Sequence, residues 1–247
     1  MSSLMPLLPF LFVIFLLAGA VKGVVGMGLP TIAMGLLSMR MAPAEAASLL
    51  LLPSLLTNLQ QAARGGALRA LLIRLWPMLV AIGLGTWLSS GIIAGHDARL
   101  ASVGLGLLLL LYALLGLGEW HLPRPRRYER AWGVMAGALT GLATGATGVF
   151  VLPAVPWLVS LRLPRETLLQ ALGLCFTAGT VALAMGLASQ GVLDARAWPA
   201  SALALLPTLL GVAIGNRLRA RLPSQLFRRL FFVTLALLGG HLLWQAV

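Results

Sequence analysis

Hydrophobic residues along this chain form eight long blocks, which short segments with charges and prolines separate: 4–39, 46–63, 71–93, 100–118, 131–161, 167–189, 197–216 and 230–246. A transmembrane helix needs about 20 mainly apolar residues, and six of the eight blocks have about that length. Blocks 4–39 and 131–161 are too long for one crossing, and glycines and prolines interrupt both. The pattern therefore predicts an all-α polytopic membrane protein in which two blocks are glycine-broken or re-entrant.

The two long blocks resemble each other, and so do the segments that follow them. Gly19 and Gly23 correspond to Gly137 and Gly141 at an offset of 118 residues, and the Trp-Pro pair at 76–77 recurs at 198–199. Matching segments in the same order indicate an internal duplication. Each repeat would contain one broken block and three transmembrane helices, which gives 8–10 membrane segments in total. The expected parts are a first repeat at 1–118, a basic cytoplasmic linker at 119–130 and a second repeat at 131–247.

The placement of basic residues predicts how the repeats are oriented. Short cytoplasmic loops of membrane proteins are enriched in Lys and Arg. If block 131–161 turns back or crosses twice, 14 of the 18 basic residues face the cytoplasm. A single crossing would instead place the five arginines of segment 217–229 outside. We therefore expect two repeats of inverted topology, an arrangement found in many secondary transporters.

Composition narrows the class of protein. The 247-residue chain is 60% hydrophobic and 10% charged, whereas soluble domains have about 25% charged residues. This excludes a soluble enzyme. A net charge of +12 would suggest nucleic-acid binding in a soluble chain, but these charges lie in loops that orient membrane helices. We expect a lipid bilayer and no nucleic acid as partner. Block 4–39 has no preceding Lys or Arg, so we expect it to be retained rather than cleaved as a signal peptide.

Sequence signatures of catalysis are absent. The chain has no His-Glu-x-x-His motif, no phosphate-binding loop and no Gly-x-Ser-x-Gly elbow. Its single cysteine, Cys175, cannot form a multi-cysteine metal site, and all six acidic residues lie in or beside loops. We therefore expect neither enzymatic activity nor a cofactor or metal ion. The oligomeric state stays open, with a homodimer as one alternative.

The broken blocks predict an anion-binding site. A helix that breaks within a bilayer leaves backbone groups that protein, water or substrate must satisfy. The N-terminus of the following half-helix favours an anion, and glycine lets a ligand approach the backbone closely. Small-x3-small pairs also pack membrane helices together, which is the simpler explanation for any single glycine pair. The predicted binding residues of the two blocks are Gly23, Gly26, Gly28, Thr140, Gly141, Thr144, Gly145, Thr147 and Gly148.

Two further polar residues join this predicted site. Lys22 is the only lysine and the only cation deep in an apolar block, a position that costs about 2.5–3.5 kcal/mol on insertion scales. Its ammonium either reaches an interface or a carbonyl, or it neutralises an anionic substrate. Asn58 lies in block 46–63 and serves either as a helix contact or as a ligand contact.

The glycine string at 19–30, its counterpart in the second half and segment 211–218 before an arginine-rich loop resemble the TauE/SafE sulfite exporter family. Asn58, within Leu-Thr-Asn-Leu-Gln, is similar to the second-helix pattern of that family, whereas Gly179 occupies the corresponding region of the second repeat. The resemblance implies a multi-pass permease of the bacterial inner membrane. Its substrate would be a small, sulfur-containing anion such as sulfite, a sulfonate or sulfoacetate.

The direction of transport follows from energetics. Each negative charge that leaves a cell with a negative interior gains about 2.3 kcal/mol per 100 mV, so anion export needs no coupling ion. The apolar blocks contain no Asp or Glu for a proton relay. We therefore expect an exporter that works by alternating access. The alternative is a passive anion channel or a helper subunit of a membrane complex.

Overall fold

The computed structural model describes residues 8–95, 98–119, 123, 127–193, 197–219 and 224–246. Within these ranges it contains ten helices and no strands, which confirms the all-α class. Half of the predicted linker 119–130 lies outside the described residues. The helices are α1 (Leu8–Val25), α2 (Leu29–Leu37), α3 (Pro43–Ala63), α4 (Leu68–Ala94), α5 (Ala98–Leu117), α6 (Glu129–Thr147), α7 (Ala154–Ser160), α8 (Arg165–Ser189), α9 (Ala197–Leu218) and α10 (Ser224–Ala246).

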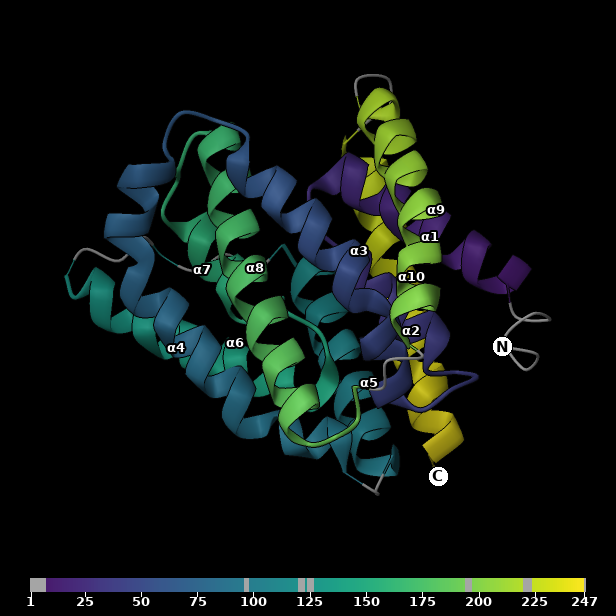
Figure 1. Ribbon diagram of the computed structural model, residues 1–247. Coiled ribbons are helices and arrows are strands. Elements are labelled where there is room, and N and C mark those ends of the chain that lie inside the picture. Colours follow the sequence, from purple (N-terminus) through teal and green to yellow (C-terminus); the bar gives the residue numbers. More distant parts are fainter. Residues whose placement is uncertain are drawn as a thin grey trace.

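Six of the described helices are long and apolar enough to cross a membrane, namely α1, α4, α5, α8, α9 and α10. They differ in how deeply they lie in the bundle. In the most apolar window of α8, 61% of the residues are buried, against 33% in those of α5 and α10. Figure 1 accordingly shows α8 near the middle of the molecule, beside α3 and α4.

Both long apolar blocks are broken, as predicted. The first consists of α1 and the nine-residue helix α2, which Gly26, Met27 and Gly28 separate. The second consists of α6 and α7, with residues 148–153 between them. Gly26, Gly28 and Gly148 have φ angles of +84°, +102° and +72°, a region that glycine adopts without a steric penalty. Glycine therefore ends each long helix and lets the chain turn.

The same succession of helices occurs twice along the chain: one long, one short and three long. The helix contacts repeat in the same way, because α1 packs on α9 as α6 packs on α4, and α3 contacts α9 as α8 contacts α4. The pairs α3–α8 and α5–α10 join the two halves (Figure 1). This pairing agrees with the expected duplication, whereas the repeat boundaries and the inverted orientation stay predictions.

Glycines form the contacts within the two tightest helix pairs. A Cβ atom added to Gly23 of α1 would lie 2.5 Å from the carbonyl oxygen of Val212 in α9. One added to Gly141 of α6 would overlap the carbonyl oxygen of Ile82 in α4. Small residues allow such close backbone approach between membrane helices. The α1–α9 and α6–α4 pairs are therefore packed backbone against backbone.

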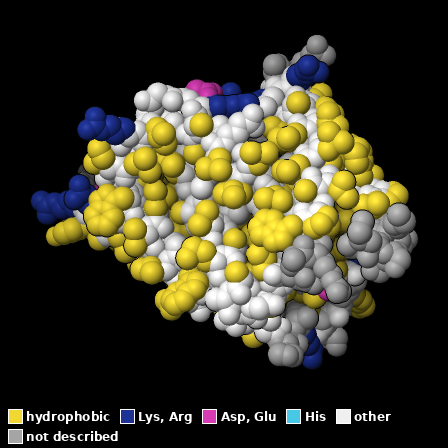
Figure 2. Space-filling view, in the orientation of Figure 1, with side chains coloured by type: hydrophobic (Ala, Val, Ile, Leu, Met, Phe, Trp, Pro, Cys, Tyr) yellow, Lys and Arg dark blue, Asp and Glu magenta, His cyan; other side chains and the backbone are white. Residues whose placement is uncertain are grey.

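The surface suits a lipid environment. Large apolar side chains are exposed along the long helices, for example Leu88 at 71%, Leu114 at 66% and Leu237 at 70%. In Figure 2 hydrophobic side chains are spread over the whole visible face, and the Lys and Arg side chains in view lie at its margins. Continuous apolar patches of this extent mark surfaces that a soluble protein would bury.

Candidate functional site

A chain of hydrogen bonds begins at Lys22, in the last turn of α1. The Nζ atom of Lys22 donates to Oδ1 of Asn58 in α3. The Asn58 amide donates in turn to Oγ1 of Thr180 in α8, at 3.2 Å, and the Thr180 hydroxyl donates to the carbonyl oxygen of Phe176, at 2.7 Å. Lys22 is 5% exposed and Asn58 is 0% exposed. The chain therefore connects three helices in the interior.

No carboxylate compensates the ammonium of Lys22 among the residues that the structure describes. The described ion pairs join Arg74 to Glu129 and Arg228 to Glu119, at the ends of helices. An ammonium has three donors, and the Asn58 oxygen receives one of them. A buried charge without a counter-charge is unfavourable unless other groups solvate it. Lys22 is therefore suited to bind an anion.

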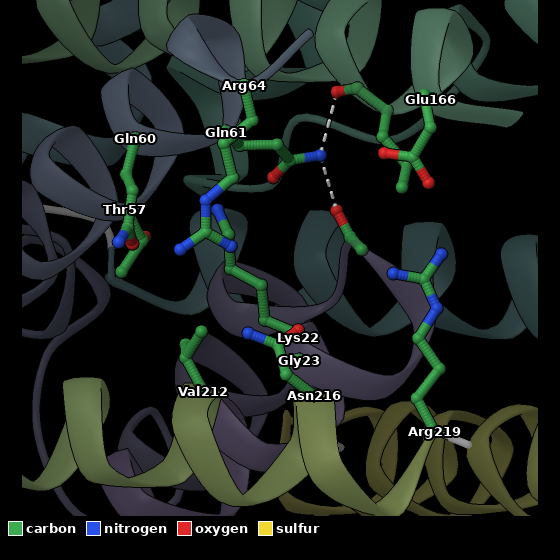
Figure 3. Close-up of a pocket in the computed structure, with 12 residues that line it drawn as sticks. Lys22, Gly23, Thr57, Gln60, Gln61, Arg64, Glu166, Val212, Asn216 and Arg219 are labelled. Carbon is green, nitrogen blue, oxygen red and sulfur yellow. Dashed lines mark hydrogen bonds between the residues drawn. The ribbon is translucent and has the colours of Figure 1, made fainter.

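A cavity of about 90 Å³ borders Lys22 between α1, α3, α8 and α9 (Figure 3). One water occupies about 10–15 Å³ of such a cavity, so this cavity has room for several waters or one small ion. Its charged lining residues are Lys22, Arg64 and Arg219 against a single acid, Glu166. The cavity is therefore electropositive.

The cavity leads from the protein surface to Lys22. Gly23, Gly26 and Thr57 are buried together with Lys22 and form its inner part. The outer part has exposed residues, which are Gln60, Arg64, Glu166 and Asn216. An ion that enters at the arginines would therefore move inward toward the lysine.

Gln61 holds the first helix break in place beside this cavity. Its Nε2 atom donates hydrogen bonds of 2.9 Å to the carbonyl oxygens of Gly26 and Leu169 (Figure 3). Gly26 is the first residue after the end of α1 that has a positive φ, and Leu169 belongs to α8. The amide thus satisfies a carbonyl that the break leaves without a helical partner.

Gly28 lies apart from the cavity. It is the N-cap of α2, and as a glycine it has no side chain to accept a hydrogen bond from the first turn of that helix. A Cβ atom at Gly28 would lie 2.9 Å from the ring of Phe231 in α10. In the first turn of α2 the hydroxyl of Thr31 is buried and has no partner among the described residues.

Threonines satisfy the backbone at the second break. The hydroxyls of Thr140, Thr144 and Thr147 each donate to the carbonyl one turn earlier in α6, at 2.6–2.7 Å. Oγ1 of Thr140 also accepts a hydrogen bond of 2.9 Å from the N–H of Ala154, the first residue of α7. Oγ1 of Thr147 accepts one of 3.3 Å from the N–H of Val149. These hydroxyls therefore already donate their protons to the backbone and have none to offer to a ligand.

The sequence also matches a known protein family. Residues 11–242 match the family described as Sulfite exporter TauE/SafE. The chain belongs to the TauE/SafE sulfite exporter family. This is a family of membrane transporters and not of enzymes, which confirms the expected multi-pass membrane protein and the expected absence of catalysis. A search of curated proteins and a search of solved structures found no match.

The predicted site residues of this TauE/SafE protein fall into two groups. Lys22, Gly23 and Gly26 line the cavity, and Asn58 bonds to Lys22. None of the predicted second-half residues lines that cavity. The second break instead packs against the short helix α2, because a Cβ at Gly148 would lie 3.0 Å from Cε of Met34. The second-half positions stay predictions without a common cavity.

Several residues of the cavity and of the hydrogen-bond chain were missing from the predicted site. Gln61 and Thr180 were visible as polar residues in apolar blocks, and such residues need partners inside a membrane. Nothing in the sequence marked Arg64 and Arg219 as site residues, because each belongs to a basic loop whose charge also orients the helices. Burial and the neighbouring Arg165 lower the pKa of Arg219, and Glu166 raises it. Only the folded chain brings these loops together.

Proposed function

We propose that this TauE/SafE protein exports a small, sulfur-containing anion such as sulfite by alternating access. The observation that carries the proposal is the buried ammonium of Lys22, which borders an electropositive cavity and has no ion pair among the described residues. The anion would bind beside Lys22, in the part of the cavity that Gly23 and Gly26 line. The Thr57 hydroxyl donates to the carbonyl oxygen of Pro53 at 2.7 Å, so its proton is not available to an anion in the cavity.

The position of the cavity supports an inward-open state. Its outer residues come from the C-terminal ends of α3 and α9 and the N-terminal end of α8. The distribution of basic residues predicts that these ends face the cytoplasm. A cytoplasmic anion would then reach Lys22 directly, and the membrane potential would favour its exit.

The helix packing supports two units that move against each other. The pairs α1–α9 and α4–α6 are locked by backbone contacts at their glycines, so each pair would move as one body. Between them, side-chain hydrogen bonds join α3 to α8, namely Asn58 to Thr180 and Gln61 to Leu169. The two helices also pack closely at Gly173, where a Cβ atom would lie 2.6 Å from the amide nitrogen of Ala62. A rocking motion of the two pairs, as in other repeat transporters, would have to change this α3–α8 contact.

Flux measurements test the substrate and the transport mode. The purified protein would be reconstituted in proteoliposomes loaded with isotopically labelled sulfite or a sulfonate. We expect saturable efflux that a negative interior accelerates. Efflux equal to that of protein-free liposomes for every such anion would refute the proposed substrate class. Ohmic single-channel currents would favour the passive channel over alternating access.

Cysteine labelling tests the access change separately. Cys175 is the single cysteine and is buried, so Cys175→Ser provides a cysteine-free background. Gln60→Cys in that background would place a thiol in the outer part of the cavity. We expect an impermeant thiol reagent to react from the cytoplasmic side, and saturating sulfite to slow the reaction. Reaction from the opposite side alone would contradict the proposed orientation.

A further inference from the structure

A second cavity, of about 280 Å³, lies next to the first and differs from it in character. Eight of its eleven lining residues are apolar, and the other three are arginines. The apolar part comes from the end of α1, from α7 and α8 and from α10, with Met27, Leu172 and Phe227 among its walls. The candidate transport site, in contrast, has mainly polar walls.

The three arginines come from three separate segments. Arg165 is the first residue of α8, Arg219 follows α9, and Arg228 lies in α10. Arg228 pairs with Glu119, and Glu166 lies close enough to Arg219 to raise its pKa. The three cations thus face two nearby carboxylates, which leaves an excess of positive charge.

Arg219 has unused hydrogen-bonding capacity. Its Nε atom is buried and has no partner among the described residues. Its neighbour Arg165 repels it, since that charge lowers the pKa of Arg219. In addition α8 begins at Arg165 without a side-chain cap, so the positive end of the helix dipole lies at the same place. Each of these features would be satisfied by an anionic group with several oxygen atoms.

We propose that this cavity binds an anionic phospholipid, with the phosphate at Arg165, Arg219 and Arg228 and the upper part of an acyl chain against the apolar walls. Basic pockets between membrane helices bind anionic headgroups in this way, and guanidinium groups bind phosphate through paired hydrogen bonds. An inorganic anion would use the arginines but gain nothing from the apolar walls. The cavity also lies at the helix ends that are predicted to face the cytoplasm, whose leaflet contains anionic lipids.

The lipid site has a direct link to the transport site but does not depend on the transported substrate. Arg219 lines both cavities. A phosphate bound to Arg219 would therefore change the charge at the outer part of the transport cavity. Lipid binding is measured without any substrate, so its failure and the failure of the proposed transport function are distinguishable.

The test compares three ligands on the full chain in an uncharged detergent. Short-chain phosphatidylglycerol, short-chain phosphatidylcholine and inorganic phosphate would each be titrated, with binding followed by native mass spectrometry and by thermal unfolding. We expect phosphatidylglycerol alone to bind as a discrete adduct and to raise the melting temperature. Equal stabilisation by inorganic phosphate would identify a simple anion site, and equal binding of phosphatidylcholine would identify a neutral lipid contact; either result overturns the proposal.

Two variants locate the binding. Arg165→Gln should weaken phosphatidylglycerol binding about fivefold, since one basic residue contributes about 1 kcal/mol to binding an anionic membrane surface. Arg217→Gln is the matched control, because Arg217 is exposed near the same helix end and lines neither cavity. Val159→Trp fills the apolar part without a change in charge, at a position that is already 39% exposed. Unchanged binding in both Arg165→Gln and Val159→Trp would refute this location.

Discussion

Between α1 and α2 the chain turns at three residues, and beside this turn lie a buried lysine, a bridging glutamine and a cavity. Between α6 and α7 it turns over six residues, and the hydroxyls of α6 bond to the backbone of the turn. The two breaks occupy matching places in the two halves. One keeps a charge available to a ligand, whereas the other satisfies its own backbone groups.

The difference begins with single residues. At the offset of 118 that aligns the glycines, Lys22 corresponds to Thr140, whose hydroxyl serves the first N–H of α7. Near the second break the side chain of Phe150 fills the space over Gly179, where a Cβ atom would lie 2.8 Å from its ring. A broken membrane helix is therefore not a binding site by itself. It becomes a candidate only where a buried charge beside it lacks a counter-charge within the described residues.

The largest effect should come from adding a side chain at Gly145, where α6 packs against α4 beside the second break. A side chain at Gly145 would overlap the carbonyl of Thr86 and lie 2.8 Å from the amide of Ser90. We expect Gly145→Leu to prevent folding or to lower stability by more than about 3 kcal/mol. Gly83→Ala in α4 is the control, because a Cβ atom there meets nothing within 4 Å. A well-folded Gly145→Leu protein, shown by a normal melting curve in detergent, would contradict the packing role.

Replacing the lysine should separate function from stability. We expect Lys22→Met to reduce sulfite efflux about 30-fold or more, because loss of one partner from a buried charge pair costs about 2–5 kcal/mol. Its melting temperature should change little, because the removal of a buried charge without a counter-charge offsets the loss of the hydrogen bond to Asn58. Arg217→Met removes the same charge from an exposed position and should leave efflux unchanged. Normal efflux in Lys22→Met would show that Lys22 has a purely structural role.

A carboxylate at position 58 should neutralise the charge of Lys22 while the lysine itself stays in place. Asn58 accepts from Lys22, so Asn58→Asp would form an internal ion pair and neutralise the site. We expect apparent anion affinity to fall about tenfold, in the range of charge-pair couplings. Asn58→Leu is the comparison, since it removes the hydrogen bond but supplies no charge, and it should lower stability more than affinity. Equal anion affinities for Asn58→Asp and the unmodified protein would argue against an electrostatic site.

The smallest effect should come from the second break. Thr140→Val keeps the shape of the side chain but leaves the N–H of Ala154 without its acceptor. We expect a loss of about 1–3 kcal/mol in stability with an unchanged half-saturation concentration for efflux. Thr234→Val is the control, because that threonine bonds one turn back at an exposed position. A changed substrate affinity in Thr140→Val would show that the second break contributes to binding after all.

The sequence was sufficient to predict the helices and their two interruptions, because both follow from local patterns. Glycine with a positive φ marks the ends at Gly26 and Gly148, and apolar block length showed that neither block could be one span. Lys22 and Asn58 were predictable as well, since polar groups deep in apolar blocks are costly.

It was harder to predict from the sequence which glycines only pack helices together and which also line the cavity. Gly23 and Gly141 have the same spacing motif, and each contacts a neighbouring helix, yet only Gly23 also borders the cavity. That distinction depends on the residues that surround them in space. Gln61, Arg64 and Arg219 come from segments far apart in sequence, so no local pattern could have assigned them to one place.

The hydrogen-bond chain from Lys22 through Asn58 to Thr180 has a consequence for the ancestry of the molecule. Its first two members lie in one half and its third in the other, so a pair of identical half-length proteins could not assemble it. Two copies of the first half would bring two lysines and two asparagines into the same interior. If the halves arose by the duplication that the sequence predicts, fusion would let one half keep a lysine that the other lacks, and the single chain would then have one positive centre where a dimer of identical halves has two.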